Sequence, residues 1–239
     1  QVPAAQEQLG YCYLEDHFNS AEQRLAYRWF EQAYQAGIHS AGCALGKLYI
    51  DGKYITANQL KGVQLCQQAA MAGATAAQLQ LAKWLLEGRV LQQDARLAMH
   101  WFDVAAKNNS AEAAFYIAQF YDTGTVVGKD AVQALVWYEL AASRGFTNAY
   151  LPAAALHWAQ YNAALDSKNN GLNNAAEHLA KAYVWASTAV QLSSAQRSDE
   201  NNQALLRQIT IVMPVSWQAE LQHSIDANLK QFSSSTHRD

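Results

Sequence analysis

Small residues recur along this chain at a fixed spacing of 36 residues, and this periodicity limits the possible folds more than any other feature. Alanine marks the register at five places, and the fifth position after each mark is always glycine or alanine. A short helix pair cannot bury its apolar face alone, so neighbouring units stack and share a core. The pattern therefore predicts an array of repeated helix pairs. The marks are Ala5, Ala41, Ala77, Ala113 and Ala149.

Each unit also carries the signals of two helices joined by a turn. Glycine follows the first apolar run, and glycine tolerates the positive φ at which many helices end. Asp94 and Asp130 stand where a short acceptor can cap the next helix. A large side chain in the second run is expected to fill the gap between helices. The recurring positions are Gly52, Gly88 and Gly124 for the first stop, Trp29, Leu65, Trp101 and Trp137 for the large side chain, and Gly37, Gly73, Asn109 and Gly145 for the second stop.

The pattern continues after the fourth unit with an insertion. The next tryptophan is expected at position 173 but is Trp185, which is 12 residues later. The inserted residues fall within 162–175, a segment rich in Asn, Ala, Ser and Gly that predicts an exposed loop. Two further helices, separated by Pro214, predict a C-terminal cap with a polar outer face.

These signals predict one all-α domain, a solenoid that spans residues 1–232, followed by a flexible tail over 233–239. Disorder of the whole chain is excluded because 51% of the residues are hydrophobic and only 15% are charged. The predicted parts are four regular repeats at 5–40, 41–76, 77–112 and 113–148, a degenerate fifth repeat at 149–192, and cap helices within 202–232.

The unit at 113–149 carries the full pattern, with Tyr121, Gly124, Asp130 and Trp137 in place. This pattern resembles the Sel-one-like repeat family, which is related to tetratricopeptide repeats. The resemblance implies an α-solenoid with a right-handed superhelical path and a non-catalytic role as a protein-binding adaptor. Bacterial members of the family often work in the cell envelope, for example in flagellar motor assembly, polysaccharide export or host interaction.

The resemblance to tetratricopeptide grooves further implies that the first helix of each unit faces a concave binding surface. The second, sixth and ninth residues after each mark then face inward, with Cys43 and Ala155 at two of these positions. The strip is apolar with sparse polar groups, which favours capture of a peptide or partner helix. The alternative is that several of these residues pack between repeats. The predicted groove residues are Glu7, Tyr11, Leu14, Lys47, Ile50, Leu79, Lys83, Leu86, Phe115, Gln119, Asp122, Leu151 and Trp158.

The sequence offers no convincing metal, cofactor or catalytic site. Residues 166–177 resemble an EF-hand loop in their first, sixth and twelfth positions, but Lys168 stands where a calcium ligand belongs. A solvated loop is therefore predicted there. The seven histidines form no HExxH or paired zinc motif, and His157 is expected to be a partly buried packing residue. We predict no catalytic residue, no metal and no cofactor.

Three cysteines, Cys12, Cys43 and Cys66, lie in apolar, helical-looking stretches and are expected to behave as small hydrophobes. Their odd number excludes a complete disulfide framework, although it leaves one disulfide open. The chain starts at Gln1, which fits either a processed protein or one cut from a longer chain. The habits of the family favour a periplasmic or exported location over a cytoplasmic one.

The leading functional hypothesis is a scaffold that binds a protein or peptide partner. A net charge of −3 gives no reason to expect nucleic acid as a partner, and no apolar run approaches the roughly 20 residues of a membrane-spanning helix. The alternative is a small-ligand-binding protein or enzyme related to β-lactams or sugars. A cysteine-rich subgroup of the family is associated with β-lactams, but this chain is expected to lack the helix-joining cysteine pairs of that subgroup. A third alternative is a homo-oligomeric structural part.

Overall fold

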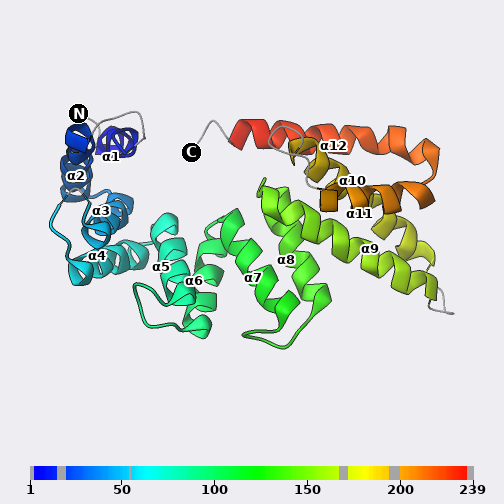
Figure 1. The fold of residues 1–239 in the computed structure, drawn as a ribbon, viewed down its shortest axis with the longest axis horizontal. Coiled ribbons are helices and arrows are strands. Elements are labelled where there is room, and N and C mark those ends of the chain that lie inside the picture. The colour runs from blue at the N-terminus through cyan, green and yellow to red at the C-terminus, as the bar shows by residue number, and fades with distance from the viewer. Residues whose placement is uncertain (1–2, 15–19, 54, 167–171, 194–199, 236–239) are drawn as a thin grey trace. The chain divides into compact units, whose positions relative to one another are not determined.

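The computed structural model describes residues 3–14, 20–53, 55–166, 172–193 and 200–235. These residues form twelve α-helices and one short 3-10 helix (Figure 1), which confirms the predicted all-α architecture of sequential helix pairs. The contacts between residues divide the chain into two compact units, Gln1–Ser110 and Ala111–Asp239. The boundary lies at the end of the third predicted repeat. A single continuous solenoid domain over residues 1–232 stays a prediction.

Unit 1 consists of three helix pairs, one for each of the first three repeats (Figure 1). Within each pair the two helices pack against each other, and successive pairs contact through α2 with α3 and α4 with α5. The helices are α1 (Pro3–Cys12), α2 (Ser20–Gln35), α3 (His39–Asp51), α4 (Gln59–Met71), α5 (Thr75–Glu87) and α6 (Ala95–Lys107).

Unit 2 holds the fourth repeat, the degenerate fifth repeat and the predicted cap. Both cap helices pack on α10, where Ile209, Met213 and Ile225 are buried and Trp217 lies against the same core, as the cap prediction requires. The elements are α7 (Ala111–Thr123), α8 (Ala131–Ser143), the 3-10 helix η1 (Thr147–Ala149), α9 (Tyr150–Asp166), α10 (Leu172–Ser193), α11 (Glu200–Val212) and α12 (Val215–Ser235).

The helix ends follow the predicted turn residues. Gly52 and Gly88 close α3 and α5 with φ of +62° and +72°, a region that favours glycine. Asn109 reaches the same region with φ of +70° after α6. Asp94 caps α6, where its carboxylate accepts a hydrogen bond from the Leu97 amide at 2.9 Å, and Asp130 caps α8 in the same way. Both the glycine stops and the aspartate caps are confirmed.

The core differs from the prediction in which aromatic residues it buries. The register alanines from Ala41 onward are fully buried, as close helix packing requires. The repeat tryptophans, however, are only half-buried, and the residue after each one fills the core instead. Phe30 and Phe102 are 0% exposed and Tyr138 is 3% exposed. Trp101 and Trp185 still pack against the core from its edge, so tryptophan contributes to the helix contact but the residue after it is the fully buried one. One residue along a helix is a rotation of about 100°, so the neighbouring position faces the partner helix.

The described parts of the inserted segment in the fifth repeat belong to two helices rather than to a loop. Helix α9 continues to Asp166 and α10 begins at Leu172, so the predicted loop over 162–175 is wrong for 162–166 and 172–175. Residues 167–171 lie outside the described residues. The inserted residues include several alanines and leucines, which favour helix strongly enough to extend both elements. Helix α12 likewise continues to Ser235, into the predicted tail.

Helices α3 and α4 approach each other unusually closely in the second repeat. A Cβ atom added to Gly46 would lie 2.4 Å from the Gly62 carbonyl oxygen, so only glycine fits there. Cys43 and Cys66 flank this crossing and form a disulfide between the two helices. The expectation of free cysteines is therefore wrong for this pair, as is the expected lack of a cysteine pair that joins helices. Cys12 is free and exposed.

Candidate functional site

Three of the predicted groove residues line one hollow in unit 1, with a volume of about 120 Å³. Helices α1, α3 and α5, the first helices of three successive repeats, supply most of its wall. This is the surface on which the resemblance placed partner binding. The lining residues are Tyr11, Leu14, Ser40, Cys43, Ala44, Lys47, Leu48, Asp51, Ala76 and Gln80.

The hollow combines an apolar floor with polar groups at its rim. Tyr11 is 43% exposed, and its ring lies edge-on against Phe30 with the centroids 5.0 Å apart. Burial, together with the negative charge of Glu7, raises the pKa of the Tyr11 phenol, which therefore stays protonated at neutral pH and can donate a hydrogen bond. Leu14 lies in the turn after α1 and packs against the core, whereas Lys47 is exposed.

The other predicted groove residues of unit 1 do not line this hollow. Ile50 packs against the core around the disulfide, and its side chain lies close to Gly62 at the helix crossing. Leu79, Lys83 and Leu86 are half-buried along α5. Their place in a binding groove stays a prediction.

In unit 2 the predicted groove residues make contacts within the helix pairs. The Phe115 ring lies 5.7 Å from the Tyr138 ring and 5.1 Å from the Phe146 ring. The Tyr138 hydroxyl donates to the Asp122 carboxylate at 3.4 Å, and burial followed by the charge of this carboxylate raises the pKa of Tyr138. Trp158 stacks on Tyr161 at 5.2 Å.

These contacts correspond to the alternative in which such residues pack inside the array. Gln119 and Leu151 are half-buried on α7 and α9. Their role in binding is likewise untested.

A polar cluster that sequence reasoning missed joins three helices of unit 2. His157 on α9 is 1% exposed, and its Nε2 donates to the Glu139 carboxylate on α8 at 3.0 Å. Its Nδ1 lies 2.9 Å from Nδ1 of His178 on α10, so one of these two nitrogens carries a proton and the other accepts it. Lys181 Nζ lies 3.2 Å from Glu139 and 3.0 Å from Glu177. His157 was expected to be a packing residue, and it is instead the centre of this cluster.

This geometry predicts that the protein loses stability as the pH falls from 7.5 to 5.5. Burial, followed by the nearby His157, lowers the pKa of His178. The unfolded chain, with histidine pKa values of about 6.5, then binds more protons than the folded one. The thermal midpoint should fall over this range and should fall less in His178→Gln. The exposed His223→Gln serves as the control, and equal pH profiles for all three proteins would contradict the prediction.

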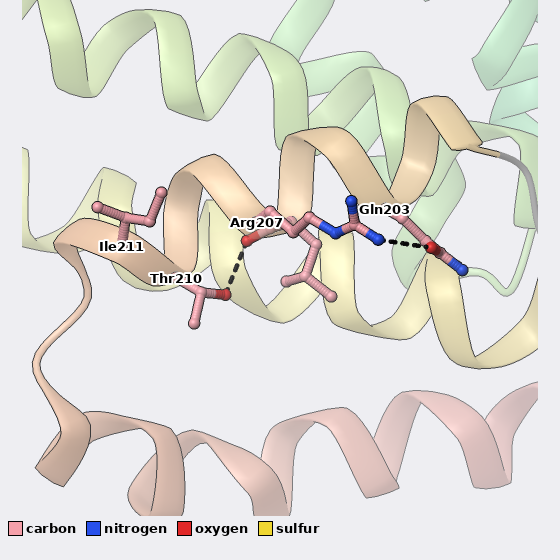
Figure 2. Close-up of a pocket in the computed structure, with 5 residues that line it drawn as sticks. Gln203, Arg207, Thr210 and Ile211 are labelled. Atoms are coloured by element: carbon pink, nitrogen blue, oxygen red, sulfur yellow. Dashed lines mark hydrogen bonds between the residues drawn. The ribbon is translucent and has the colours of Figure 1, made fainter.

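A second missed feature is a hollow of about 590 Å³ along α11. Figure 2 shows Gln203, Arg207, Thr210 and Ile211 along this one helix. The Arg207 guanidinium donates to the Gln203 side chain at 3.3 Å, and the Thr210 hydroxyl donates to the Leu206 carbonyl at 2.7 Å. No predicted groove residue lies here. Leu206 and Ile211 are the only apolar lining residues and do not stand at the spacing of one helix face, so periodicity gave no signal for this hollow.

The structure adds no metal site to these features. Among the residues it describes, no group of three or more His, Cys, Asp or Glu side chains could hold a metal ion. The central part of the calcium-like segment 166–177 lies outside the described residues. Within those same limits, no helix has the length and apolar character needed to cross a membrane.

Several solved bacterial structures resemble this fold. A Sel1 repeat protein from Oxalobacter formigenes is 29% identical, with a TM-score of 0.54, and the match covers 65% of this chain and 64% of that protein. A protective antigen with an SLR fold from uropathogenic Escherichia coli is 14% identical, with a TM-score of 0.52 and coverage of 98% and 70%. A Pseudomonas aeruginosa protein is 15% identical, with a TM-score of 0.50 and coverage of 97% and 81%. The last two show the fold alone.

The match spans just under two thirds of the Oxalobacter protein's own length. No curated protein matches the sequence. The Sel1 repeat pattern, in contrast, matches residues 3–38, 40–73, 75–110 and 111–146, which follow the repeats read from the sequence to within a few residues. Since these four segments make up more than half of the chain, this protein belongs to the Sel1 repeat family.

Proposed function

We propose that this chain is a non-catalytic scaffold that binds a peptide or a partner helix in the groove of unit 1. The observation that carries the proposal is the convergence of Tyr11, Leu14 and Lys47 on one hollow formed by successive repeats. The family is generally non-catalytic, which supports a binding role. The Sel1 scaffold supplies the rigid surface, and the side chains at the hollow supply the selectivity.

The size and charge of the hollow indicate what a partner would present. An apolar cavity of about 150 Å³ can take one benzene ring, so a hollow of about 120 Å³ fits one apolar side chain. Lys47 and Asp51, one helical turn apart at the rim, can pair with polar or charged groups on either side of that anchor. A peptide with one apolar anchor flanked by charged residues therefore fits better than a broad flat protein surface.

The disulfide supports an exported location for this scaffold. Disulfides persist in oxidising compartments such as the periplasm and are rare in the bacterial cytoplasm. The Cys43–Cys66 bond joins α3, which lines the hollow, to α4 behind it. A bacterial envelope or an extracellular setting would keep this bond formed and the wall of the hollow fixed.

The test is a charge reversal at the rim. Peptides selected from a displayed random library against the wild-type protein should bind Lys47→Glu about tenfold more weakly, since one lost charge pair costs about 1.4 kcal/mol. Lys47 is exposed, so the fold should survive, and Lys129→Glu is the matched control in another exposed segment. Binding is measured by biolayer interferometry. Equal affinities for all three proteins would place the peptide site elsewhere.

A further inference from the structure

A larger hollow of about 730 Å³ lies on another part of unit 1. Helix α5 forms its floor, helices α4 and α6 form its sides, and the connector between α5 and α6 closes one end. The lining residues are Gln67, Met71, Leu81, Leu85, Leu91, Gln92, Gln93, Asp94, Leu97 and Trp101.

The floor and much of the sides of this hollow are apolar, and its polar side chains are three glutamines and one aspartate. Leu81 and Leu85 at the floor are 2% and 6% exposed and belong to the core of the unit. Met71 and Leu97 at the sides are 80% and 43% exposed, which is unusual for large apolar residues. Trp101 is only half-buried, since Phe102 takes the core position, and its ring therefore lines the hollow. A ligand here would cover an aromatic ring and several aliphatic side chains.

The hollow offers no positive charge to a ligand. Asp94 is the only charged residue in the lining, and its carboxylate caps helix α6 by accepting the Leu97 amide hydrogen at 2.9 Å. The Gln93 amide donates to the Leu86 carbonyl at 2.9 Å. Gln67 and Gln92, both exposed, add neutral amide groups at the rim. An anion would lose its hydration without gaining a cationic partner, so this lining favours an uncharged ligand over an anionic one.

The equivalent space between the first two repeats is bridged by polar side chains. Lys61 on α4 donates to the Tyr49 hydroxyl on α3 at 2.6 Å and lies over the ring of that tyrosine. The Tyr49 hydroxyl lies 3.3 Å from that of Tyr27 on α2, which donates to Glu31 at 2.9 Å. Lys61, Tyr49 and Tyr27 therefore tie two second helices together across the first helix between them, and Glu31 accepts from the Tyr27 hydroxyl on the same helix.

Three of these four positions are bridged again in unit 2. Glu139, His157 and Lys181 are the equivalents of Glu31, Tyr49 and Lys61 once the 12-residue insertion is counted. Glu139 accepts from His157 at 3.0 Å and pairs with Lys181 at 3.2 Å. A carboxylate, a polar ring and a lysine thus recur at both junctions.

At the large hollow, all four bridging groups are replaced. The residues 36 positions after Tyr27, Glu31, Tyr49 and Lys61 are Val63, Gln67, Leu85 and Leu97. Leucine at position 85 has no hydroxyl or ring nitrogen to reach the neighbouring helices, and leucine at position 97 cannot form an ion pair. The hollow therefore lies at the junction where apolar side chains stand in place of the bridge.

We propose that this hollow is a binding site for a small, uncharged and largely apolar molecule, with Trp101 as an aromatic wall and the amides of Gln67 and Gln92 as hydrogen-bonding groups. Small-molecule sites usually measure roughly 300–1,000 Å³ and are apolar with a few polar groups, and the volume of about 730 Å³ falls within this range. The groove hollow of about 120 Å³ is too small for such a ligand. The two sites therefore have different occupants.

The experiment titrates the full chain with N-phenyl-1-naphthylamine, an uncharged apolar probe whose fluorescence rises when it leaves water. We expect saturable binding at one site in the wild-type protein. The variant Gln67→Glu/Leu85→Tyr/Leu97→Lys introduces three of the four bridging side chains of the preceding junction into the hollow and should bind the probe at least tenfold more weakly while keeping its helical circular dichroism. Should the triple variant fail to fold, the single exposed change Leu97→Lys should still weaken binding several-fold.

Two results would overturn the proposal. One is the absence of saturable probe binding by the wild-type protein. The other is unchanged affinity in both folded variants, which would place the probe elsewhere, such as the hollow along α11. If the wild-type protein bound no probe but the triple variant lost affinity for the selected peptides, the hollow would serve a protein partner instead. Lys47 lies outside this hollow, so the peptide test and the probe titration can fail independently.

Discussion

Removal of the Cys43–Cys66 disulfide by a Cys43→Ser change is expected to lower the free energy of unfolding by about 3 kcal/mol. The bond closes a loop with a sequence separation of 23 residues, and such a crosslink lowers the conformational entropy of the unfolded chain. The loss should appear in guanidinium denaturation followed by far-ultraviolet circular dichroism. Dithiothreitol should cause a similar loss in the wild-type protein and little further loss in the variant.

Cys12 provides the matched control because it is exposed and free. Cys12→Ser should leave the denaturation midpoint unchanged. Thiol titration of the unfolded wild-type protein without reductant should find one reactive cysteine, and with reductant it should find three. Three thiols without reductant, together with equal stability of both serine variants, would show that Cys43 and Cys66 do not form the bond.

A Gly46→Ala change is expected to destabilise the protein by about 2 kcal/mol, as overpacking of a tight contact does. The new Cβ would meet the Gly62 carbonyl oxygen at 2.4 Å, and a backbone atom cannot move aside as a flexible side chain can. Helix propensity alone predicts the opposite sign, since alanine stabilises a helix interior by about 1 kcal/mol relative to glycine. The sign of the change in urea denaturation therefore decides which effect dominates.

Gly128→Ala is the control for this experiment. A Cβ at Gly128 would meet no atom within 4 Å, and its φ is not in the left-handed region. This change should be neutral or slightly stabilising, because it restricts the unfolded chain. If Gly46→Ala behaved like Gly128→Ala, helices α3 and α4 would lie farther apart than the structure places them.

The helix boundaries were predictable from sequence because they depend on local backbone chemistry. Gly88 and Asn109 tolerate the positive φ that ends a helix, and Asp94 supplies the acceptor that begins one. These requirements involve only a few neighbouring residues, so residue type alone was enough. The same holds for the register alanines, whose recurrence reflects the close approach of paired helices.

The errors concern features that depend on which way a helix faces or how far apart two helices lie. Periodicity placed Trp101 at a helix contact, yet Phe102 fills the core, since the pattern does not fix the rotation of the helix about its axis. The disulfide depends on a separation between α3 and α4 that Gly46 and Gly62 permit, and sequence spacing alone does not give that distance.

The candidate site could be predicted only in part. Tyr11, Leu14 and Lys47 converge on a hollow as the resemblance implied, but Phe115 and Asp122 at equivalent positions contact their own helix pair. Whether a predicted groove position stays open to a partner depends on the side chains that the neighbouring helices place against it. The larger hollow did leave a signal, because Leu85 stands where other repeats carry tyrosine or histidine.

The bridge of side chains between repeats has a consequence for how such arrays diversify. The bridged junction and the large hollow differ in the side chains at equivalent repeat positions, represented by Glu31, Tyr49 and Lys61. On the proposal made above, a repeat protein of this kind can gain, lose or relocate a small-molecule site by exchanging a few side chains. Stability and ligand choice then depend on different positions of the same 36-residue unit.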